Sequence, residues 1–390
     1  MKIVMLCDLY DDAAQYQENL LAKYYAKHGH EVVVVAATFD STLDYTTNRY
    51  DRRAVGREYR DGDVKVIKRP YAFNILNRLR SLRGVDQILQ SEQPDLIFLH
   101  DIHLNLPQAA AYKRAHPACR VVMDYHADYS NSAQSWISFH ILHKLIRRSV
   151  LHRYRHMIDR VYPVVPASAQ FLHEVYGLDL ADLELLPLGA DTDLARATRQ
   201  ARAGREVRRS YSIPDDAVVI FTGGKLTRAK RTNLLVEAMA RLDYLDLHLF
   251  VVGDFQDGDP AYRQAFMEAR ARNPRVHMTG WVSGKDVYRF MDACDLAVFP
   301  ASQSVLWQQA LSMGLPLIVG RVGVQDCSYM NPYENIIMLD EPHIRADRIA
   351  DRVREMVTNR ERLAERQSAA LRAADELLNY DKLILKTFGR

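Results

Sequence analysis

The sequence predicts an α/β protein built from two doubly wound domains. The chain has 390 residues, which is more than a single hydrophobic core commonly organises. Short β-branched runs alternate with helical patterns, beginning with Lys2–Leu6, Gln17–Lys27 and Glu31–Ala37. This alternation stops in the polar, Arg-rich segment 196–209 and then starts again. Two successive series of this kind indicate two domains, and we expect the boundary near residue 190.

The first domain opens with a strand, a loop, a helix and a second strand, which is the order of a βαβ unit. The first helical pattern ends at Gly29, a residue type favoured after helix ends. The run Glu31–Ala37 is apolar almost throughout, which is typical of a strand buried on both faces. We expect further strands at 63–68, 95–100, 120–124, 161–165 and from 185, and helices at 76–91, 105–114, 136–157 and 169–176.

The second domain shows the same alternation. We expect its strands at 217–221, 247–252, 276–279, 296–299, 314–320 and 335–339, and its helices at 233–242, 262–272, 285–293 and 305–313. Two more helices close the chain. The predicted organisation is therefore a first domain over 1–190, a second over 191–374, and a last helix over 375–390 that returns to the first. Parallel sheets bind ligands at the carboxyl ends of their strands, so we expect the two domains to face a central cleft.

Composition excludes several classes of protein. The net charge is +3, from 52 basic and 49 acidic residues, which does not indicate a nucleic-acid partner. The four cysteines are scattered without a C-x-x-C pair, so we expect no structural zinc, no disulfide framework and a reducing cytoplasm. No run approaches the roughly 18 apolar residues of a membrane span. We expect a soluble protein or one attached to a membrane surface.

The strongest motif follows the first strand of the second domain and reads Gly-Gly-Lys-Leu-Thr-Arg-Ala-Lys-Arg over 223–231. Glycines allow backbone amides to approach an anion, and the following helix points its positive end at the same place. Lys225 and Lys230 could both reach one diphosphate and stabilise its charge as a bond to it breaks. The alternative is a solvated basic loop. Position and lysine spacing favour the phosphate site, with Gly224 at its turn.

Seven motifs in order give the chain a resemblance to a known family. They are Tyr16-Gln-Glu-Asn19, Leu186-Pro-Leu-Gly-Ala-Asp191, Gly224-Lys-Leu-x-x-x-Lys230, Val251-Val-Gly-Asp254, Val276-His-Met-Thr-Gly280, Asp295-Leu-Ala-Val-Phe-Pro300 and Gln309-Ala-Leu-Ser-Met-Gly-Leu-Pro316. The set resembles the retaining family-4 glycosyltransferases of the GT-B fold, also called glycosyl transferases group 1. Each motif alone is weak, but their order and spacing cover nearly the whole chain.

The resemblance implies a nucleotide-diphosphate sugar, UDP- or GDP-linked, held mainly by the second domain, and an acceptor held by the first. It implies that Gly224, Lys225 and Lys230 bind the donor diphosphate, with Lys230 also catalytic. Gly280 and Trp281 would lie by the nucleobase. No metal ion and no cofactor are expected, because the lysines supply the positive charge and no aspartate-rich motif follows a strand.

The sequence departs from the family pattern in the last motif. The family carries two glutamates eight positions apart after the proline, one near the transferred sugar and one on the ribose. After Pro300 this chain has a shorter loop without a carboxylate. Gln309 takes the place of the second glutamate, with Gln308 beside it, and Ser304 is nearest to the first. A glutamine can bind ribose hydroxyls, but more weakly than a carboxylate.

His126 follows a strand of the first domain directly, and the matching family histidine lies next to the transferred sugar. An imidazole at a strand end can bond a hydroxyl or accept a proton. The alternative is a histidine that only satisfies a turn, since the chain has 14 histidines. Other polar residues of the first domain are expected to line the acceptor cleft. They are Tyr16, Gln17, Glu18, His100, Asp101, His103 and Asp128.

Two short features of this domain have alternative interpretations. His100-Asp101-Ile-His103 could suggest a metal, but one loop that supplies every ligand makes a poor site, so we interpret it as cleft lining. Asp11 and Asp12 occupy a loop where the family has a glycine near the donor phosphates. Two carboxylates would repel a diphosphate, so we expect them to face the acceptor or solvent.

The segment 140–160 combines isoleucine, leucine and valine at helical spacing with five lysines and arginines between them. Such an amphipathic basic helix suits an anionic membrane surface. The alternative is a surface helix whose apolar stripe packs on the sheet, and both can hold at once. We therefore expect a cytoplasmic protein with a possible peripheral contact at the inner membrane face.

The function predicted first is transfer of a sugar, with retention, to a glycan or lipid-linked acceptor in bacterial-type surface polysaccharide or glycoconjugate biosynthesis. The second is a non-catalytic homologue that binds a nucleotide-sugar or partners an active subunit, which the missing glutamates motivate. The third, a nucleotide-sugar epimerase on the same fold, is disfavoured by the order of the motifs.

Overall fold

The computed structural model describes residues 1–47, 49–51, 53–255, 259–301 and 303–389. It divides into two compact units, Met1–Leu188 with Tyr380–Arg390, and Gly189–Asn379. The sequence placed these boundaries at 190 and 374. The later one differs because α14 (Arg360–Ala373) continues into a π-helical turn, η7 (Ala374–Leu378). Leu378 also accepts a hydrogen bond from Ala190 at 3.0 Å, so the chain stays in the second unit through Asn379.

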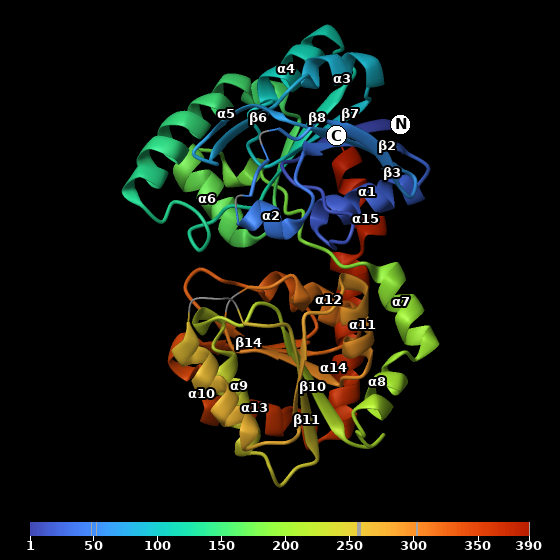
Figure 1. Ribbon diagram of the computed structural model, residues 1–390, viewed down its shortest axis with the longest axis vertical. Helices are drawn as coiled ribbons and strands as arrows, with labels where there is room; N and C mark the ends of the chain where they lie inside the picture. The colour runs from blue at the N-terminus through green and yellow to red at the C-terminus, as the bar shows by residue number, and fades with distance from the viewer. Residues whose placement is uncertain (48, 52, 256–258, 302, 390) are drawn as a thin grey trace. The chain divides into compact units, whose positions relative to one another are not determined.

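The first unit is built on a seven-stranded sheet (Figure 1). Its order is β3 (Arg57–Asp61), β4 (Val64–Arg69), β2 (Glu31–Ala37), β1 (Lys2–Leu6), β7 (Leu96–His100), β8 (Arg120–Tyr125) and β9 (Arg160–Pro163). Only β3 runs antiparallel to its neighbour among the described pairs. The chain order reverses between β1 and β7, and open α/β sheets bind ligands at the strand ends beside such a reversal.

Helices cover both faces of this sheet, which explains its continuously apolar strands. Ile3 and Met5 of β1 face a core shared with α1 (Gln17–Lys27) and α15 (Tyr380–Phe388). Alternate residues face the other core, which is closed by α3 (Val85–Glu92), α4 (Leu106–Ala115), α5 (Arg148–Tyr154) and α6 (Pro166–Tyr176). The last helix of the chain therefore belongs to the first unit and packs on α1.

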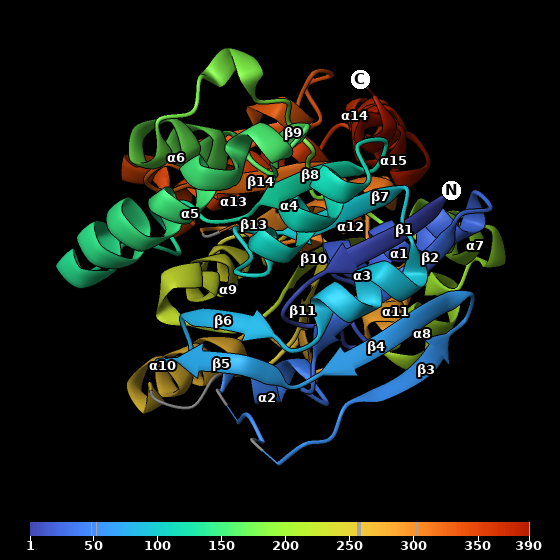
Figure 2. The same cartoon turned by 90° about the horizontal axis from the view of Figure 1, so that it is seen from above.

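Two sequence expectations for this unit are wrong. The predicted helix at 76–91 begins only at Val85, with α3; its first part is instead the turn and second strand of a hairpin of β5 (Tyr71–Ile75) and β6 (Leu79–Leu82), a sheet of its own (Figure 2). The reason is a tight turn in which Leu76 and Asn77 both have positive φ. The strand expected from 185 is also missing among the described elements, where that region gives only isolated bridges, of Leu183 with Val161 and of Ala190 with Asn379.

The helical prediction for 136–157 is confirmed, but the first part is a π-helix, η1 (Ile137–Arg147), followed by α5 and a 3₁₀ turn, η2 (Arg155–Met157). The unit also contains α2 (Thr42–Thr46) and η3 (Leu180–Asp182). No described helix is long and apolar enough to cross a bilayer.

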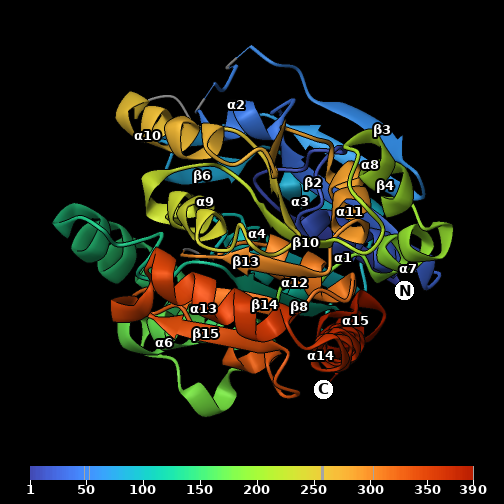
Figure 3. The ribbon, with the colours of Figure 1, turned by 90° about the horizontal axis from the view of Figure 1, so that it is seen from below.

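The second unit is a six-stranded parallel sheet (Figure 3). Its order is β12 (Val276–Gly280), β11 (Leu247–Val252), β10 (Val218–Gly223), β13 (Leu296–Phe299), β14 (Leu317–Arg321) and β15 (Ile336–Asp340). The chain order reverses between β10 and β13. The loop after β10, which carries the predicted diphosphate motif, therefore begins at this reversal.

Helices again cover both faces, including two in the segment 196–209 for which no element was predicted. One core is closed by α7 (Thr192–Ala201), α8 (Gly204–Ser210), α11 (Gly284–Asp292), α12 (Leu306–Ser312) and α14. The other is closed by α9 (Thr232–Ala240), α10 (Pro260–Ala271) and α13 (Ala346–Val357). Short 3₁₀ turns are η4 (Arg228–Lys230), η5 (Ser328–Met330) and η6 (Glu341–His343).

Candidate functional site

Two glycines shape the turns at the carboxyl ends of β10 and β11. The Gly224 amide donates to the carbonyl of Val252 at 2.8 Å, and both Gly224 and Gly253 have positive φ. A Cβ atom at position 253 would lie 2.1 Å from the carbonyl oxygen of Gly224. The loop after β10 can take this path because no side chain separates the two turns.

The two lysines of the motif lie on this loop. Lys225 is exposed, whereas Lys230, on η4, is partly buried and donates to the carbonyl of Gln303 at 3.4 Å. Burial, and then the nearby charge of Lys225, lowers the pKa of Lys230. The two ammonium groups repel each other, and an anion bound between them would relieve this repulsion. The loop thus concentrates positive charge beside Gly224.

The two glutamines lie on α12, the helix that follows β13. The amide of Gln308, fully buried, lies between the carbonyls of Ser304 and Val305 and the hydroxyl of Tyr329. Gln309 is also buried, but its Oε1 has no hydrogen-bond partner among the described residues. Ser304 accepts from the amide of Leu306 at the start of α12. Gln308 and Ser304 are therefore occupied within the fold, and Gln309 keeps an unused acceptor.

Gly280 ends β12 and accepts a hydrogen bond from the Gly253 amide at 2.9 Å. Trp281, which follows it, is 59% exposed. Gly224, Gly253 and Gly280 thus form a connected series of turns along one edge of the sheet. The structure brings together the residues that the sequence assigned to diphosphate and nucleobase.

In the first unit the polar residues lie after β1, β7 and β8, which are neighbours in the sheet. Asp124 Oδ2 lies 3.2 Å from His100 Nδ1 and 3.0 Å from His126 Nε2. Its other oxygen accepts from the Asp101 amide at 3.1 Å, and the Asp101 carboxylate accepts from the His126 amide at 2.9 Å. Asp101 closes this ring in a left-handed conformation, at φ 61°. The network fixes the position of the His126 ring.

The charges of this network depend on one another. Burial lowers the pKa of His100, but Asp124, Glu18 and Asp101 together outweigh it, so the net pKa of His100 is well above its ordinary value. Burial raises the pKa of Asp124, but His100 and His126 together lower it by more. The net pKa of Asp124 is therefore well below its ordinary value, and Asp124 is a carboxylate. Nearby Glu18 has a raised pKa, chiefly because it is buried.

The start of α1 contributes three predicted residues to this unit. Gln17 is 4% exposed, and neither atom of its amide has a partner among the described residues. Tyr16 is 38% exposed, and Glu18 is buried beside the two imidazoles. The loop before them is structural, because Asp11 accepts from Thr42 at 2.8 Å and Asp12 from the Tyr59 hydroxyl at 2.8 Å.

His103 and Asp128, the last two residues predicted to line the acceptor cleft, have different surroundings. His103 is buried, and its Nε2 has no hydrogen-bond partner among the described residues. Asp128 is 2% exposed and accepts from the amide and hydroxyl of Ser130, so its carboxylate stabilises a turn.

Sequence reasoning missed Asp8, Arg80 and Asp124. Arg80 Nη1 lies 3.1 Å from Asp8 Oδ2, and Asp8 Oδ1 lies 3.9 Å from His103 Nε2. Asp8 comes two residues after the first strand, and Asp124 is the next-to-last residue of another, so strand ends were the available signal. Arg80 had no such signal, because it lies on a hairpin strand that the sequence pattern predicted to be part of a helix at 76–91.

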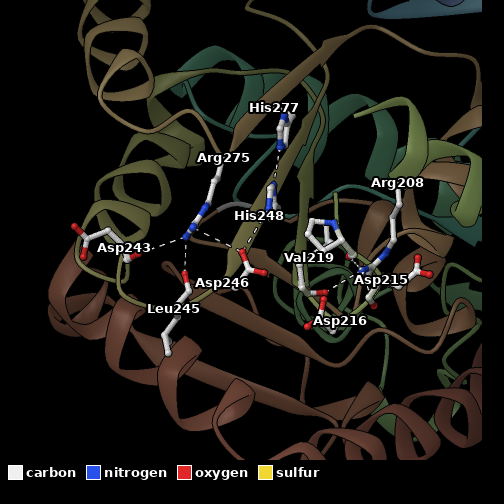
Figure 4. Close-up of polar contacts among 12 residues, drawn as sticks. Arg208, Asp215, Asp216, Val219, Asp243, Leu245, Asp246, His248, Arg275 and His277 are labelled. Carbon is white, nitrogen blue, oxygen red and sulfur yellow. Dashed lines mark hydrogen bonds and ion pairs between the residues drawn. The ribbon is translucent and has the colours of Figure 1, made fainter. Parts of the chain in front are cut away.

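A further polar group lies at the amino ends of the strands of the second unit's sheet, opposite to the loops described above (Figure 4). His248 Nδ1 and His277 Nε2 are 3.0 Å apart near the amino ends of β11 and β12. Arg275 and Arg208 lie close by, and Arg208 bonds Asp295 at 2.9 Å. Because ligands of parallel sheets bind at the carboxyl ends, this group is structural.

Two doubly wound α/β units in one chain, each with its polar residues after the carboxyl ends of its strands, define the GT-B fold. The sequence pattern of Glycosyltransferase Family 4 matches residues 19–194, and that of Glycosyl transferases group 1 matches residues 204–373. Together they account for both units. The chain belongs to the family-4 glycosyltransferases with the GT-B fold.

Solved structures share this fold at low sequence identity. Anabaena Alr3699/HepE in complex with UDP and glucose is 16% identical, with a TM-score of 0.66 over 100% of this chain and 98% of that one. A trehalose-6-phosphate structure from E. coli bound with UDP-2-fluoro glucose is 11% identical, with a TM-score of 0.69 over 100% and 98%. WaaG, a glycosyltransferase involved in lipopolysaccharide biosynthesis, is 17% identical, with a TM-score of 0.57 over 99% and 98%. No curated protein matches the sequence.

Proposed function

We propose that the chain transfers a sugar, with retention, from a UDP- or GDP-linked donor to a glycan or lipid-linked acceptor. The observation that carries the proposal is the pair Lys225 and Lys230 beside Gly224, where burial, and then the charge of Lys225, lowers the pKa of Lys230. Similar folds bind UDP and UDP-sugars in Anabaena HepE and in the E. coli structure. WaaG supports a lipid-linked or polysaccharide acceptor.

In this proposal the lysines act on the leaving group. The donor diphosphate gains negative charge as its bond to the sugar breaks, and two cations in a partly buried site stabilise that charge. The same cations replace a metal ion, so we expect transfer to proceed without one. Gln309 offers its unpartnered Oε1 to a ribose hydroxyl, and Gly280 and Trp281 lie on the nucleobase side.

The first unit holds the acceptor and the reacting side of the sugar. His126 is half-buried and fixed by Asp124 and Asp101, so its ring can bond a sugar hydroxyl without reorganising. Gln17 supplies a buried amide with free donor and acceptor atoms. Glu18, His100 and His103 complete a polar lining suited to hydroxyl groups.

We also propose peripheral attachment to an anionic membrane surface through the helix that starts at η1. Four apolar side chains are exposed there: Trp136 (67%), Ile137 (68%), Ile141 (39%) and Leu145 (58%). Lys144 and Arg153 are exposed cations on the same helical stretch. Exposed aromatic and aliphatic residues flanked by cations are the composition of an interfacial helix. An acceptor embedded in a membrane would then lie close to the first unit.

A second candidate is a non-catalytic homologue that binds a nucleotide-sugar. The absence of a carboxylate at 304 and 309 favours it, because the family resemblance implies two glutamates in this segment. Incubation with a panel of UDP- and GDP-sugars, with and without EDTA, separates the two candidates. Slow release of nucleoside diphosphate, unchanged by EDTA, is expected of the transferase. Tight binding without release, with any acceptor tested, contradicts transfer and supports the homologue.

A further inference from the structure

Three side chains of the first unit have the composition of a transition-metal site. His100 Nδ1, Asp124 Oδ2 and His126 Nε2 all lie within 4.8 Å of one another. Two imidazoles and one carboxylate form a ligand set that binds divalent ions of the zinc class. The three come from the ends of two strands, β7 and β8, and not from a single loop. This removes the objection that the sequence raised against His100 and His103.

The spacing also suits such an ion. Bonds of about 2.0–2.2 Å in tetrahedral geometry place neighbouring ligand atoms roughly 3.3 Å apart. The two imidazole nitrogens lie 3.2 and 3.0 Å from the Asp124 oxygen. These two distances are close to those between neighbouring atoms of a coordination shell, and the two nitrogens lie within 4.8 Å of each other.

The surrounding residues hold these ligands in place. Asp101 bonds both the Asp124 carboxylate and the His126 backbone, and Asn131 donates to the His126 carbonyl at 3.1 Å. Such outer contacts orient metal ligands and are part of a functioning site. The Asp124 side chain is fully buried, whereas those of His100 and His126 are 22% and 24% exposed. An ion can thus enter from the side of the rings and keep a position for water.

The local charge favours a cation as well. Glu18 and Asp101 join Asp124 in acting electrostatically on His100, so three carboxylates surround two imidazoles. Glu18 is only 6% exposed. A divalent ion bound beside these carboxylates would be stabilised by their negative charge.

We propose that His100, Asp124 and His126 bind one divalent ion of the zinc class. Resting on the proposed function, we further infer that the bound ion inhibits sugar transfer, because an imidazole of His126 that coordinates the ion through Nε2 can no longer accept a proton at that atom. Zinc is then a regulator of the site and not a cofactor of the reaction. The metal-free chain is the active form.

Direct binding tests the site without any donor or acceptor. The full-length chain, stripped of metal, is titrated with Zn²⁺ against a chromophoric chelator, and with Co²⁺ while its visible absorption is recorded. We expect one equivalent to bind and a Co²⁺ spectrum typical of low coordination number. His100→Gln and Asp124→Asn should each weaken binding by at least about tenfold. Circular dichroism establishes that both variants fold.

His140→Gln is the matched control, because His140 is an exposed histidine on η1, outside the three-residue group. It should bind as tightly as the wild type. Binding no tighter in the wild type than in His100→Gln overturns the site. Stoichiometric zinc binding that leaves transfer activity unchanged overturns the inhibitory role alone. A chain that binds zinc but never turns over any donor contradicts the transferase function and leaves the site intact.

Discussion

Gly253 directly follows β11, at a point where the neighbouring loop leaves no space for a side chain. Its φ is 135°, and an added Cβ would lie 2.1 Å from the Gly224 carbonyl oxygen. Gly253→Ala should therefore cost roughly 3–5 kcal/mol of unfolding free energy, from backbone strain and from the forced shift of the loop. Chemical denaturation measures this loss.

Gly280→Ala is the matched control. Its φ is also positive, at 71°, but no atom lies within 4 Å of the added Cβ. It should cost only about 1 kcal/mol. Equal losses in the two variants would show that the close approach of the two turns is not what requires glycine at 253.

At the residue scale, what the sequence could predict depended on spacing along the chain. Lys225 and Lys230 were found because they share one loop with Gly224. His126 was found because it follows a strand. Asp124 was missed as a partner of two histidines, since its contact with His100 depends on the register of β7 against β8. Arg80 required a hairpin turn in which Leu76, a residue type that usually avoids positive φ, adopts it together with Asn77.

At the element scale, α15 is the last helix of the chain and a structural part of the first unit. Ile384 is fully buried in the core between α15 and α1, and Tyr25 of α1 bonds Thr387 at 2.8 Å. Ile384→Ala should destabilise the first unit by about 2–5 kcal/mol. The adjacent Leu385, 57% exposed, provides the control, and Leu385→Ala should cost less than about 0.5 kcal/mol. Similar losses for both would contradict this packing.

The exposed apolar side chains of η1 make a prediction about membranes. The double substitution of Ile137→Asp and Leu145→Asp should abolish sedimentation with vesicles that contain phosphatidylglycerol. It removes apolar area that would insert into the membrane, and it adds negative charge that the anionic lipid repels. Leu385→Asp changes an equally exposed residue on another helix and should leave binding unchanged. Co-sedimentation at low and moderate salt measures the effect. Wild-type protein that never sediments with such vesicles would refute the membrane contact.

Elements with clear hydrophobic periodicity were predicted well, and elements set by turns were not. The buried strands β2, β10 and β11 are continuous apolar runs, and their predicted bounds differ from the observed ones by at most two residues. The β5–β6 hairpin has an apolar pattern that also suits a helix, and only tertiary packing separates the two. The π-helical hydrogen bonding of η1 had no sequence signal.

At the scale of the whole molecule, each unit contains a histidine, buried in the first and partly buried in the second, that is neutral in the fold. Burial, and then Arg147, lowers the pKa of His143 to about 4 in the first unit. Burial, and then His248, lowers the pKa of His277 to about 4 in the second. A depressed histidine pKa gives stability that is complete above the ordinary value of 6.5 and is lost as pH falls from there to 4.

We therefore expect the melting temperature to fall by several degrees between pH 7 and pH 4.5. The raised pKa of His100 does not offset this, because its contribution is already complete below pH 6.5. His277→Gln should make the melting temperature of the second unit less dependent on pH. His140→Gln should leave this dependence unchanged. Calorimetry across this pH range tests the prediction. A wild-type melting temperature that does not change with pH would contradict it.

The division into two doubly wound units could be predicted from the sequence because the strand–helix alternation stops and restarts. The family motifs lie on the loops of these units at the expected strand ends. The replacement of the glutamate pair was equally visible. Its consequence was not, because only the folded chain shows that Gln308 is bonded internally while Gln309 keeps a free acceptor.

The central claim is that the second unit binds a nucleotide diphosphate through Lys230. Isothermal titration of UDP and GDP into the wild type, Lys230→Ala and Arg228→Ala tests it most directly. Arg228 lies on the same loop but pairs with Asp259 at 2.9 Å. Lys230→Ala should weaken binding of the preferred nucleotide by about 10- to 100-fold, and Arg228→Ala by no more than about fivefold. Equal affinity in the wild type and Lys230→Ala would contradict the account.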